Sequence, residues 1–230
     1  MKSANSMPDK IAVIIPAFNA AKTIIPLIEK IQKEFPELDI IVIDDGSTDQ
    51  TFSLAKKVKA IVLQHQLNLG KGEALRTGFK YATEKNYSYV ITLDADLQHD
   101  PKHIKDFLQI AKTDKPDFIL GTRDFSFRNM PWDRVLTNSL TSVILTLLSG
   151  QKIKDSQSGY RMISEKVLKS IRLKSKRYDL ESEILIKAGR KGFKIEAVEI
   201  FTIYEGSKSF INPFSDTGRF LRICWKSLFW

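Results

Sequence analysis

Apolar runs alternate with segments of helical spacing in residues 11–122 of this 230-residue chain, and this alternation limits the fold more than any other feature. The runs expected to form strands are 11–18, 39–43, 60–64, 89–93 and 117–122. Because nearly every residue in them is apolar, both faces of each strand must be covered, which is typical of parallel strands between helices. The sequence therefore predicts an α/β fold with a mostly parallel sheet flanked by helices.

Polar or small residues follow each of these strands. They are PAFN at 16–19, DDGS at 44–47, NLGKG at 68–72, DAD at 94–96 and GTR at 121–123. Parallel strands bring their carboxyl ends to one edge of the sheet, and α/β proteins bind ligands beyond that edge. We therefore expect these segments to form a single site.

Asp94 and Asp96 are the clearest candidates for a metal site. Residues two apart in extended backbone point to the same side, so both carboxylates can reach one point beyond the strand, and Ala95 leaves room there for a ligand. Carboxylate oxygens suit a hard divalent cation, Mg²⁺ or Mn²⁺, that also binds substrate phosphate. Taken alone, the pair could equally be two solvated loop aspartates.

Other strand ends carry residues suited to a nucleotide. Lys71 lies at a helix start, where anions bind, although its spacing is not that of a Walker phosphate loop. Arg123 could offer counter-charge to a diphosphate, and Asp44 could accept hydrogen bonds from a base or ribose. The alternatives are a solvated lysine and arginine, and a turn with a helix cap for Asp44 and Asp45.

The polar segment DSQSGYR at 155–161 follows a hydrophobic stretch and precedes a helix. A connection of this kind needs only a short polar turn. The segment is therefore either a connecting loop or part of a site, in which Arg161 is a plausible anion contact.

Two segments have the pattern of amphipathic helices. Residues 131–149 carry one apolar stripe, made of Leu136, Leu140, Val143, Ile144 and Leu147. The stripe either faces the core or lies in a membrane interface, with Trp132 at headgroup level. Residues 219–230 place basic residues (Arg219, Arg222, Lys226) opposite apolar ones (Leu221, Cys224, Trp225, Leu228). This pattern fits a membrane surface, with a docked terminal helix as the alternative.

The net charge of +9 favours anionic partners such as phosphates or a membrane surface. A nucleic-acid ligand is not expected, because the basic residues outside the tail lack interleaved aromatic residues that could stack on bases.

No run is apolar and long enough to span a bilayer. We expect a disordered tail over 1–9, a main folded domain over 10–210 and an amphipathic segment over 211–230. The three histidines, His65, His99 and His103, show no metal-ligand spacing.

An ordered set of motifs resembles glycosyltransferase family two, which has the Rossmann-like GT-A fold. The motifs are PAFN, VIDDGSTD, NLGKGEALRTGF, LDADLQHDP, GTRD, DSQSGYR, YDLESEILIKAGRKGF and IEAVEI. Within that family the chain is similar to the polyprenyl-phosphate glycosyltransferases, such as those of the dolichol-phosphate mannose synthase type. The resemblance covers roughly residues 11 to 210.

The resemblance implies roles for individual positions. The nucleotide-sugar would be bound by Pro16, Phe18, Val42, Asp44, Asp45, Lys71, Ala95, Arg123 and Lys208. The cation, Mg²⁺ or Mn²⁺, would be held by Asp94, Asp96 and Gln98. Asp94, Asp96 and Arg123 would act in catalysis, and Arg134 or Arg161 would meet the acceptor phosphate.

The expected reaction is an inverting, metal-dependent transfer of a hexose from a GDP- or UDP-sugar to a polyprenyl phosphate, at the cytoplasmic face of a membrane. An acceptor phosphate is already ionised, so it needs positioning more than a general base. One alternative is a family-two enzyme that extends a sugar chain, for which Asp155 is the best candidate base. The other is a non-catalytic protein that binds a membrane surface through its basic tail.

Overall fold

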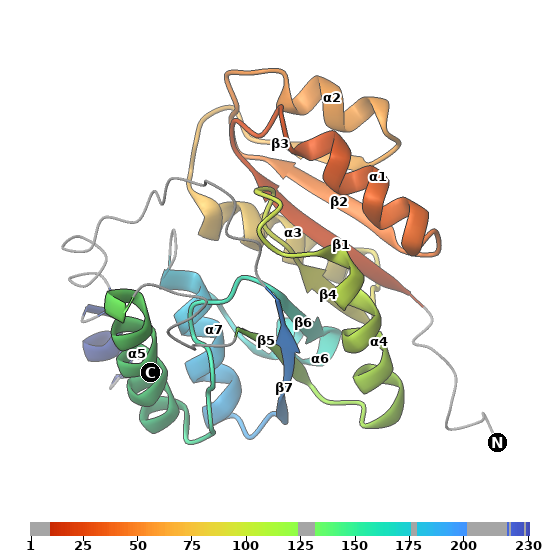
Figure 1. The fold of residues 1–230 in the computed structure, drawn as a ribbon. Helices are drawn as coiled ribbons and strands as arrows, with labels where there is room; N and C mark the ends of the chain where they lie inside the picture. The colour runs from red at the N-terminus through yellow and green to blue at the C-terminus, as the bar shows by residue number, and fades with distance from the viewer. Residues whose placement is uncertain (1–9, 124–131, 176–178, 202–219, 221, 228) are drawn as a thin grey trace.

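The computed structural model describes residues 10–123, 132–175, 179–201, 220, 222–227 and 229–230. Within these ranges, seven strands form one sheet in the order β3-β2-β1-β4-β6-β5-β7 (Figure 1). The strands are β1 (Ile11–Ala17), β2 (Asp39–Asp44), β3 (Ile61–Gln64), β4 (Tyr89–Thr92), β5 (Phe118–Arg123), β6 (Arg161–Ser164) and β7 (Ile195–Ile200). The five strands predicted from apolar runs are all present, with ends that differ by one residue.

Helices connect these strands. They are α1 (Ile24–Glu34), α2 (Thr51–Lys57), α3 (Lys71–Glu84), α4 (Ile104–Thr113), α5 (Trp132–Ser149), α6 (Glu165–Ser170) and α7 (Asp179–Arg190), with a short 3₁₀ helix, η1 (Pro101–His103), before α4. Residues 220 and 222–227 are also helical. Pro101 begins η1, where its missing N–H costs nothing, and the Asp100 side chain accepts a hydrogen bond from the Lys102 N–H.

The sheet is mostly parallel, which confirms the predicted α/β class. β1 pairs in parallel with β2 and β4, β2 with β3, and β5 with β7. β6 runs antiparallel to β4 and β5. β6 was not predicted, because it has only four residues and directly follows the polar segment 155–160, so it carries neither a long apolar run nor a clear alternation.

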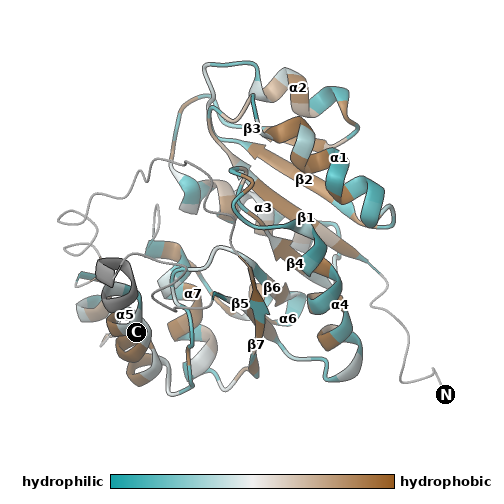
Figure 2. Cartoon of the chain, viewed as in Figure 1, coloured by the Kyte–Doolittle hydropathy of each residue, from teal (hydrophilic) through white to brown (hydrophobic). Residues whose placement is uncertain are grey.

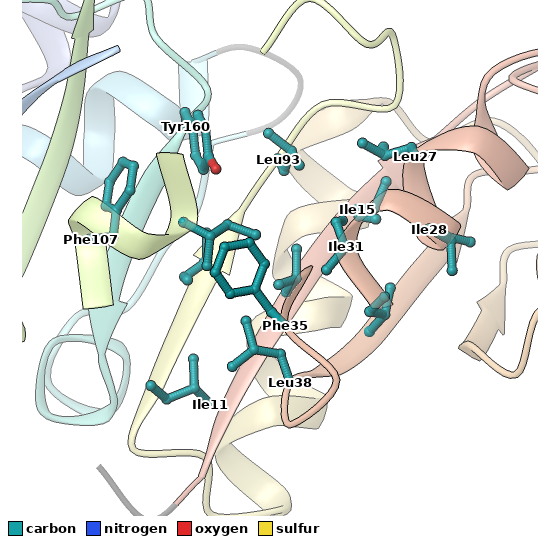
Figure 3. Packing of buried hydrophobic residues seen from close by; sticks show 14 of the residues in the cluster. Ile11, Ile15, Leu27, Ile28, Ile31, Phe35, Leu38, Leu93, Phe107 and Tyr160 are labelled. Atoms are coloured by element: carbon teal, nitrogen blue, oxygen red, sulfur yellow. The ribbon is translucent and has the colours of Figure 1, made fainter. Parts of the chain in front are cut away.

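Two hydrophobic clusters cover the two faces of the sheet. On one face, residues of α1 and α4 join one cluster with residues of the sheet, and Ile28, Ile31 and Phe35 point into this cluster (Figure 3). Phe107 from α4 stacks on Tyr160 there, with ring centroids 4.7 Å apart. On the other face, α3 and α7 bury Leu75, Phe79 and other residues. Both faces are covered, as the nearly continuous apolar strands require.

The direction of the chain reverses between β1 and β4. From β1 the chain moves outward to β2 and β3, and it then returns to place β4 on the other side of β1. Loops after two such strands diverge, which opens a crevice at their carboxyl ends. In the described part of the chain, no helix is both long and apolar enough to cross a bilayer.

Candidate active site

A cleft of about 630 Å³ opens at the predicted edge of the sheet, beyond the ends of β1 and β4. Its lining includes five of the nine residues predicted to bind a nucleotide-sugar, namely Pro16, Phe18, Asp45, Lys71 and Ala95, and the two predicted metal ligands Asp94 and Asp96. The volume lies within the range typical of small-molecule sites. These residues lie up to 80 positions apart in the sequence, and the parallel strands of the sheet bring them together.

The loop after β1 forms one wall of the cleft. Phe18 is 48% exposed and lines the cleft. Asn19 has a positive φ of 51°, and its side-chain oxygen accepts a hydrogen bond from the Thr48 N–H at 2.9 Å, while its own N–H donates to Ser47 Oγ at 2.9 Å. These bonds fix the loop after β1 against the loop after β2, so that Phe18 presents an apolar face to a ligand.

Asp45 lines the cleft and holds the loop that precedes α3. Its carboxylate accepts hydrogen bonds from the N–H groups of Leu69 at 3.0 Å and Gly70 at 2.7 Å, and from His65 Nδ1 at 2.7 Å. Both carboxylate oxygens are therefore occupied within the protein. Asp45 fixes the loop that leads into α3 and so determines where Lys71 lies.

Asp44 and Val42 lie beneath the cleft and do not line it. Residues of β2 alternate between the two faces of the sheet, and Val42 is fully buried in the hydrophobic cluster beside α1. Val42 therefore does not line the cleft, and its predicted contact with the nucleoside is wrong. Asp44 is also buried; its Oδ2 accepts a hydrogen bond from Gln64 at 3.0 Å, but its Oδ1 has no partner. A buried carboxylate oxygen without a partner is unusual.

Three charged groups meet at the floor of the cleft. Lys71 Nζ lies 2.7 Å from Asp94 Oδ1 and 3.2 Å from Glu181 Oε1, which comes from the first turn of α7. Burial alone would lower the pKa of Lys71, but the two carboxylates outweigh it and raise the pKa. For Asp94, burial opposes ionisation, yet the Lys71 ammonium lowers the pKa overall. Asp94 is therefore charged and already paired with a cation.

Asp96 also lines the cleft, but it is exposed, whereas Asp94 is half-buried. Its pKa is raised, first by desolvation and then by repulsion from Asp94. The turn that follows Asp96 is strained: Leu97 has a φ of 62°, in the left-handed region that a branched side chain avoids. A strained turn that brings two carboxylates together against their repulsion fits a divalent cation, which would relieve that repulsion.

The carboxylates in the described residues do not form a complete metal cage. No group of three or more His, Cys, Asp or Glu residues in these ranges could hold an ion by itself. Mg²⁺ and Mn²⁺ commonly take one or two carboxylates and complete their shell with water and substrate phosphate. Asp94 and Asp96, with Gln98 in the same turn, fit that kind of site.

Arg123 and Asp155 form a buried pair beside the cleft. The Arg123 guanidinium donates through Nε at 2.7 Å and Nη2 at 3.0 Å to the two carboxylate oxygens of Asp155. Asp155 is fully buried and also accepts from the Arg123 N–H at 3.1 Å. Asp155 is therefore not the general base suggested for a chain-extending enzyme, because both its oxygens are occupied. It instead orients Arg123 at the end of β5.

Comparison with known proteins identifies the family. The model for "Glycosyl transferase family 2" matches residues 12–172, which contain every part of the cleft except Glu181. The chain belongs to glycosyl transferase family 2. This membership confirms the family inferred from the ordered motifs, and it makes the protein a glycosyltransferase.

Several relatives of this transferase are similar over most of their length. A UDP-N-acetylglucosamine–dolichyl-phosphate N-acetylglucosaminyltransferase of Methanococcus voltae is 36% identical over 86% of this chain and 88% of that protein. A polyprenol monophosphomannose synthase of Mycolicibacterium smegmatis is 28% identical over 82% and 75%. The glucosyl-3-phosphoglycerate synthase of Mycobacterium tuberculosis has the same GT-A fold, with a TM-score of 0.73 at 22% identity over 95% of this chain and 77% of that one.

Arg161 has a different position from the one predicted for it in the transferase. It is only 2% exposed, and it donates hydrogen bonds to the carbonyl oxygens of Ser158 at 2.8 Å, Glu181 at 2.7 Å and Ser156 at 3.1 Å. A side chain that is buried and bonded to three carbonyl oxygens is not exposed to an acceptor phosphate, so the predicted contact is not what the structure has. Arg161 ties the 155–159 segment to α7.

Two other predicted contacts cannot be placed. Lys208 lies outside the described residues. Arg134 belongs to α5, but its side chain is not among those described. Residues 1–9 and 211–219, parts of the predicted tail and terminal segment, are likewise outside the described ranges.

Sequence reasoning missed three residues around Asp94. Glu181 and Gly159 belong to motifs quoted for the family, but neither had been assigned a role. His99 had been set aside for lack of metal-ligand spacing. Its ring is buried beside Tyr160, its Nδ1 has no hydrogen-bond partner, and burial lowers its pKa to about 4, so it is neutral at pH 7. Its place directly after Gln98 in the metal-site turn was the available signal.

We expect that any side chain at position 159 weakens ligand binding. A Cβ at this position would lie 2.6 Å from Asp94 Oδ2 and 2.9 Å from Lys71 Nζ, so both groups would have to move. We expect Gly159→Ala to weaken Mn²⁺-dependent UDP or GDP binding by about tenfold or more, since displacement of about 1 Å has large effects in such sites. Calorimetry measures the affinity, and thermal unfolding shows whether the fold is kept. Unchanged affinity in a stable variant would mean that Asp94 and Lys71 do not hold the ligand.

The apolar stripe of α5 faces outward. Leu140, Val143 and Leu147 are 58%, 58% and 78% exposed, whereas Thr141 and Ser142 are buried. The buried hydroxyls bond to the 155–157 segment: Ser142 Oγ accepts from the Ser156 N–H at 3.0 Å, and Ser156 Oγ donates to Thr141 Oγ1 at 3.1 Å. The core-facing alternative is therefore wrong for these three apolar residues. Figure 2 shows the hydrophobic colouring along α5.

The C-terminal helix both docks on the body and presents aromatic residues. Ile223 and Ser227 are buried, and Arg190 donates hydrogen bonds to the Ser227 and Leu148 carbonyl oxygens, which links this helix to the end of α5. Trp225 and Phe229 are 66% and 74% exposed and contact each other edge to face. Docking, which had been the alternative to a surface role, is compatible with it.

Proposed function

We propose that this transferase moves a hexose from a UDP- or GDP-sugar to a polyprenyl phosphate, with inversion at the anomeric carbon and with the aid of Mg²⁺ or Mn²⁺. The observation that carries the proposal is the cleft at the ends of β1 and β4, where Asp94, Asp96 and Lys71 meet. The named relatives from Methanococcus voltae and Mycolicibacterium smegmatis support the lipid-phosphate acceptor.

The donor would lie across the cleft from β2 to β4. Its nucleoside would contact Phe18 and Pro16, above the buried Asp44. Its diphosphate would lie near the amino end of α3, where backbone N–H groups and the helix dipole favour anions. Solved structures of the glucosyl-3-phosphoglycerate synthase hold UDP with Mn²⁺ or Mg²⁺, which supports this arrangement.

Charge neutralisation would drive the reaction. The bond between the anomeric carbon and the diphosphate oxygen breaks, its electron pair leaves with the nucleoside diphosphate, and an acceptor phosphate oxygen bonds to the opposite face of the sugar. A cation held by Asp94, Asp96 and Gln98 supplies positive charge to the departing diphosphate when it is bound. Arg123, held in place by Asp155, adds positive charge at the same edge.

No general base is required for such an acceptor, since a lipid phosphate is ionised at neutral pH. The chain-extending alternative needs a base to deprotonate a hydroxyl, and its best candidate, Asp155, is fully buried and paired with Arg123. This difference favours the lipid phosphate. The non-catalytic alternative is not compatible with membership of a transferase family whose motifs surround the cleft.

The acceptor tail would lie against the outward faces of α5 and the C-terminal helix. An exposed stripe of Leu140, Val143 and Leu147 beside exposed Trp225 and Phe229 has the composition of a membrane-interface surface. We therefore include in the proposal a peripheral location at the cytoplasmic face of a membrane. The division into a transferase domain over 10–210 and a membrane-contacting segment over 211–230 belongs to the same proposal.

A donor screen tests this function. Purified protein is incubated with labelled UDP- and GDP-sugars, a membrane lipid extract and Mn²⁺, and the organic phase is counted. We expect one donor to label the lipid fraction, and chelator to abolish the label. Label found only in water-soluble saccharides would favour the chain-extending alternative, and no turnover of any donor would contradict both.

Replacing the outward stripe of α5 should separate membrane attachment from chemistry. We expect Leu140→Ser/Val143→Ser/Leu147→Ser to lower binding to lipid vesicles by about tenfold or more, because each large apolar side chain contributes roughly 1.5–3 kcal/mol when fully buried. Transfer to a short, water-soluble polyprenyl phosphate serves as the control and should fall by less than about twofold. Vesicle binding equal to that of wild type would exclude α5 from the membrane contact.

A further inference from the structure

A second cavity, of about 280 Å³, lies between the C-terminal helix and the start of α7, and it shares no lining residue with the active-site cleft. It is lined by Lys174, Ser175, Asp179, Arg222, Ile223 and Lys226. Three of these six residues are cationic and one is acidic. A cavity of this charge and size fits a phosphate group with a small polar substituent.

The wall of this cavity is fixed by buried hydrogen bonds. The carboxylate of Glu183, fully buried on α7, accepts the N–H groups of Lys174 at 3.0 Å and Ser175 at 2.7 Å. Arg76 from α3 donates to the Ser175 carbonyl oxygen. The segment that carries Lys174 is therefore anchored from two helices. On the opposite wall, buried Ile223 holds the C-terminal helix against the body.

The cations of the cavity are available for a ligand. Among the described residues, no side-chain ion pair or hydrogen bond is recorded for Lys174, Arg222 or Lys226, whereas Lys187 nearby is paired with Glu183. Arg222 and Lys226 are exposed and lie one turn apart, so both can reach one anion.

The cavity also lies beside the exposed aromatic pair. At 100° per residue, the buried residues Ile223 and Ser227 define the inner face of the C-terminal helix, and Trp225 and Phe229 point away from it. Arg222 and Lys226 lie between the aromatic face and the cavity. An interfacial helix has this order, with apolar residues toward the lipid and basic residues beside them at headgroup depth.

We propose that this cavity binds the phosphate of an anionic phospholipid headgroup, with the acyl chains toward Trp225 and Phe229. The lipid would be a second one, distinct from the acceptor, and it would orient the active-site cleft relative to the bilayer. This inference rests on the proposed membrane-associated function and adds a specific binding site to it. A lipid is favoured over a free phosphate because the cavity adjoins an exposed apolar surface.

Vesicle co-sedimentation of the full chain tests the site. Vesicles of phosphatidylcholine with phosphatidylglycerol are compared with vesicles of phosphatidylcholine alone. We expect Arg222→Gln/Lys226→Gln to lose about 30-fold in binding to the anionic vesicles, since each basic residue at an anionic surface contributes roughly fivefold. The charge-preserving variant Arg222→Lys/Lys226→Arg should keep most of the binding.

A control variant that loses the same charge elsewhere on the surface distinguishes binding in the cavity from general electrostatic attraction to the vesicle. Lys33 and Lys57 are exposed residues of α1 and α2, and Lys33→Gln/Lys57→Gln should lower binding by less than about twofold. Equal losses in the two double variants would overturn the proposal. Wild-type binding to vesicles that does not depend on phosphatidylglycerol, together with binding of inorganic phosphate that Arg222→Gln/Lys226→Gln loses, would also overturn it, since the ligand would then be a free anion.

A separate measurement distinguishes failure of the proposed function from failure of the headgroup site. Binding of UDP or GDP by the wild-type chain reports on the active-site cleft and does not involve vesicles. Thermal unfolding of each variant shows that it is folded before vesicle binding is compared. A chain that binds nucleotide but shows no difference between the double variants keeps the transferase proposal and loses only the headgroup site.

Discussion

Asp96→Asn should remove nearly all sugar transfer, by about 100-fold or more, as expected when a group that stabilises transition-state charge is lost. Asp96 lines the cleft, and the raised pKa of its carboxyl reflects desolvation and the nearby Asp94 carboxylate. An amide of the same size keeps the shape of the turn but cannot supply the negative charge that a divalent cation needs. Steady-state rates with saturating donor and acceptor measure the loss.

The same variant should not destabilise the protein. A carboxyl whose pKa is higher in the folded state than in the unfolded state opposes folding once it ionises, so neutralising it leaves the metal-free protein equally or slightly more stable at pH 7. Mn²⁺ with UDP or GDP should raise the melting temperature of wild type and not that of Asp96→Asn. Asp114→Asn, at an exposed position after α4, serves as the control. Full activity of Asp96→Asn would contradict metal binding at this position.

Arg161→Met should lower the free energy of unfolding by about 3 kcal/mol or more, because it leaves buried carbonyl groups without their donors. The side chain donates to three carbonyl oxygens, and its positive charge lies near Glu181, Asp155 and Asp94. Arg161→Lys should recover only part of this loss, since one ammonium cannot reproduce the geometry of the guanidinium. Urea unfolding measures the change.

Arg172→Met is the matched control, because Arg172 is exposed and should change stability by less than about 0.5 kcal/mol. The comparison also decides between two roles for Arg161. If it supports the fold, stability falls in Arg161→Met and transfer falls with it. A variant as stable as the control, with only a raised KM for the lipid acceptor, would restore Arg161 as an acceptor contact.

The sequence was sufficient to predict the parallel part of the sheet and the edge at which the cleft opens. Strand runs such as 39–43 are apolar on both faces, and the helices between them have clear spacing, so a mostly parallel sheet with its ligand site at the carboxyl ends of the strands follows from general rules. Asp94, Asp96 and Lys71 follow strands or begin a helix at that edge, and they do meet there. The family motifs led to the same residues independently.

The partners of these charges could not be predicted in the same way. Asp155 and Arg161 belong to one polar segment, and nothing in their spacing tells a buried arginine from an exposed one. The structure buries both: Asp155 pairs with Arg123 from β5, and Arg161 bonds to the carbonyl oxygen of Glu181 on α7. Such contacts depend on β6, the short antiparallel strand that brings this segment under the cleft.

The sequence also did not determine whether the apolar stripe of α5 faces the core or the solvent. An amphipathic pattern gives two faces, and burial of the apolar face is the usual outcome. Here the hydroxyl groups of Thr141 and Ser142 find partners in the 155–157 segment, so the polar face can pack inward and the apolar face is left outside. The pattern predicted the helix, but only the three-dimensional partners show which face is buried.

Transfer to a polyprenyl phosphate compared with the matching polyprenol is the most direct test of the central claim. Purified protein receives the preferred sugar nucleotide, Mn²⁺ and one of the two lipids, which differ only in the phosphate. The account predicts a labelled glycosyl phospholipid from the polyprenyl phosphate and none from the polyprenol, because the alcohol needs a base and Asp155 is paired with Arg123. Equal transfer to the polyprenol, or transfer to neither lipid but to a water-soluble saccharide, would contradict it.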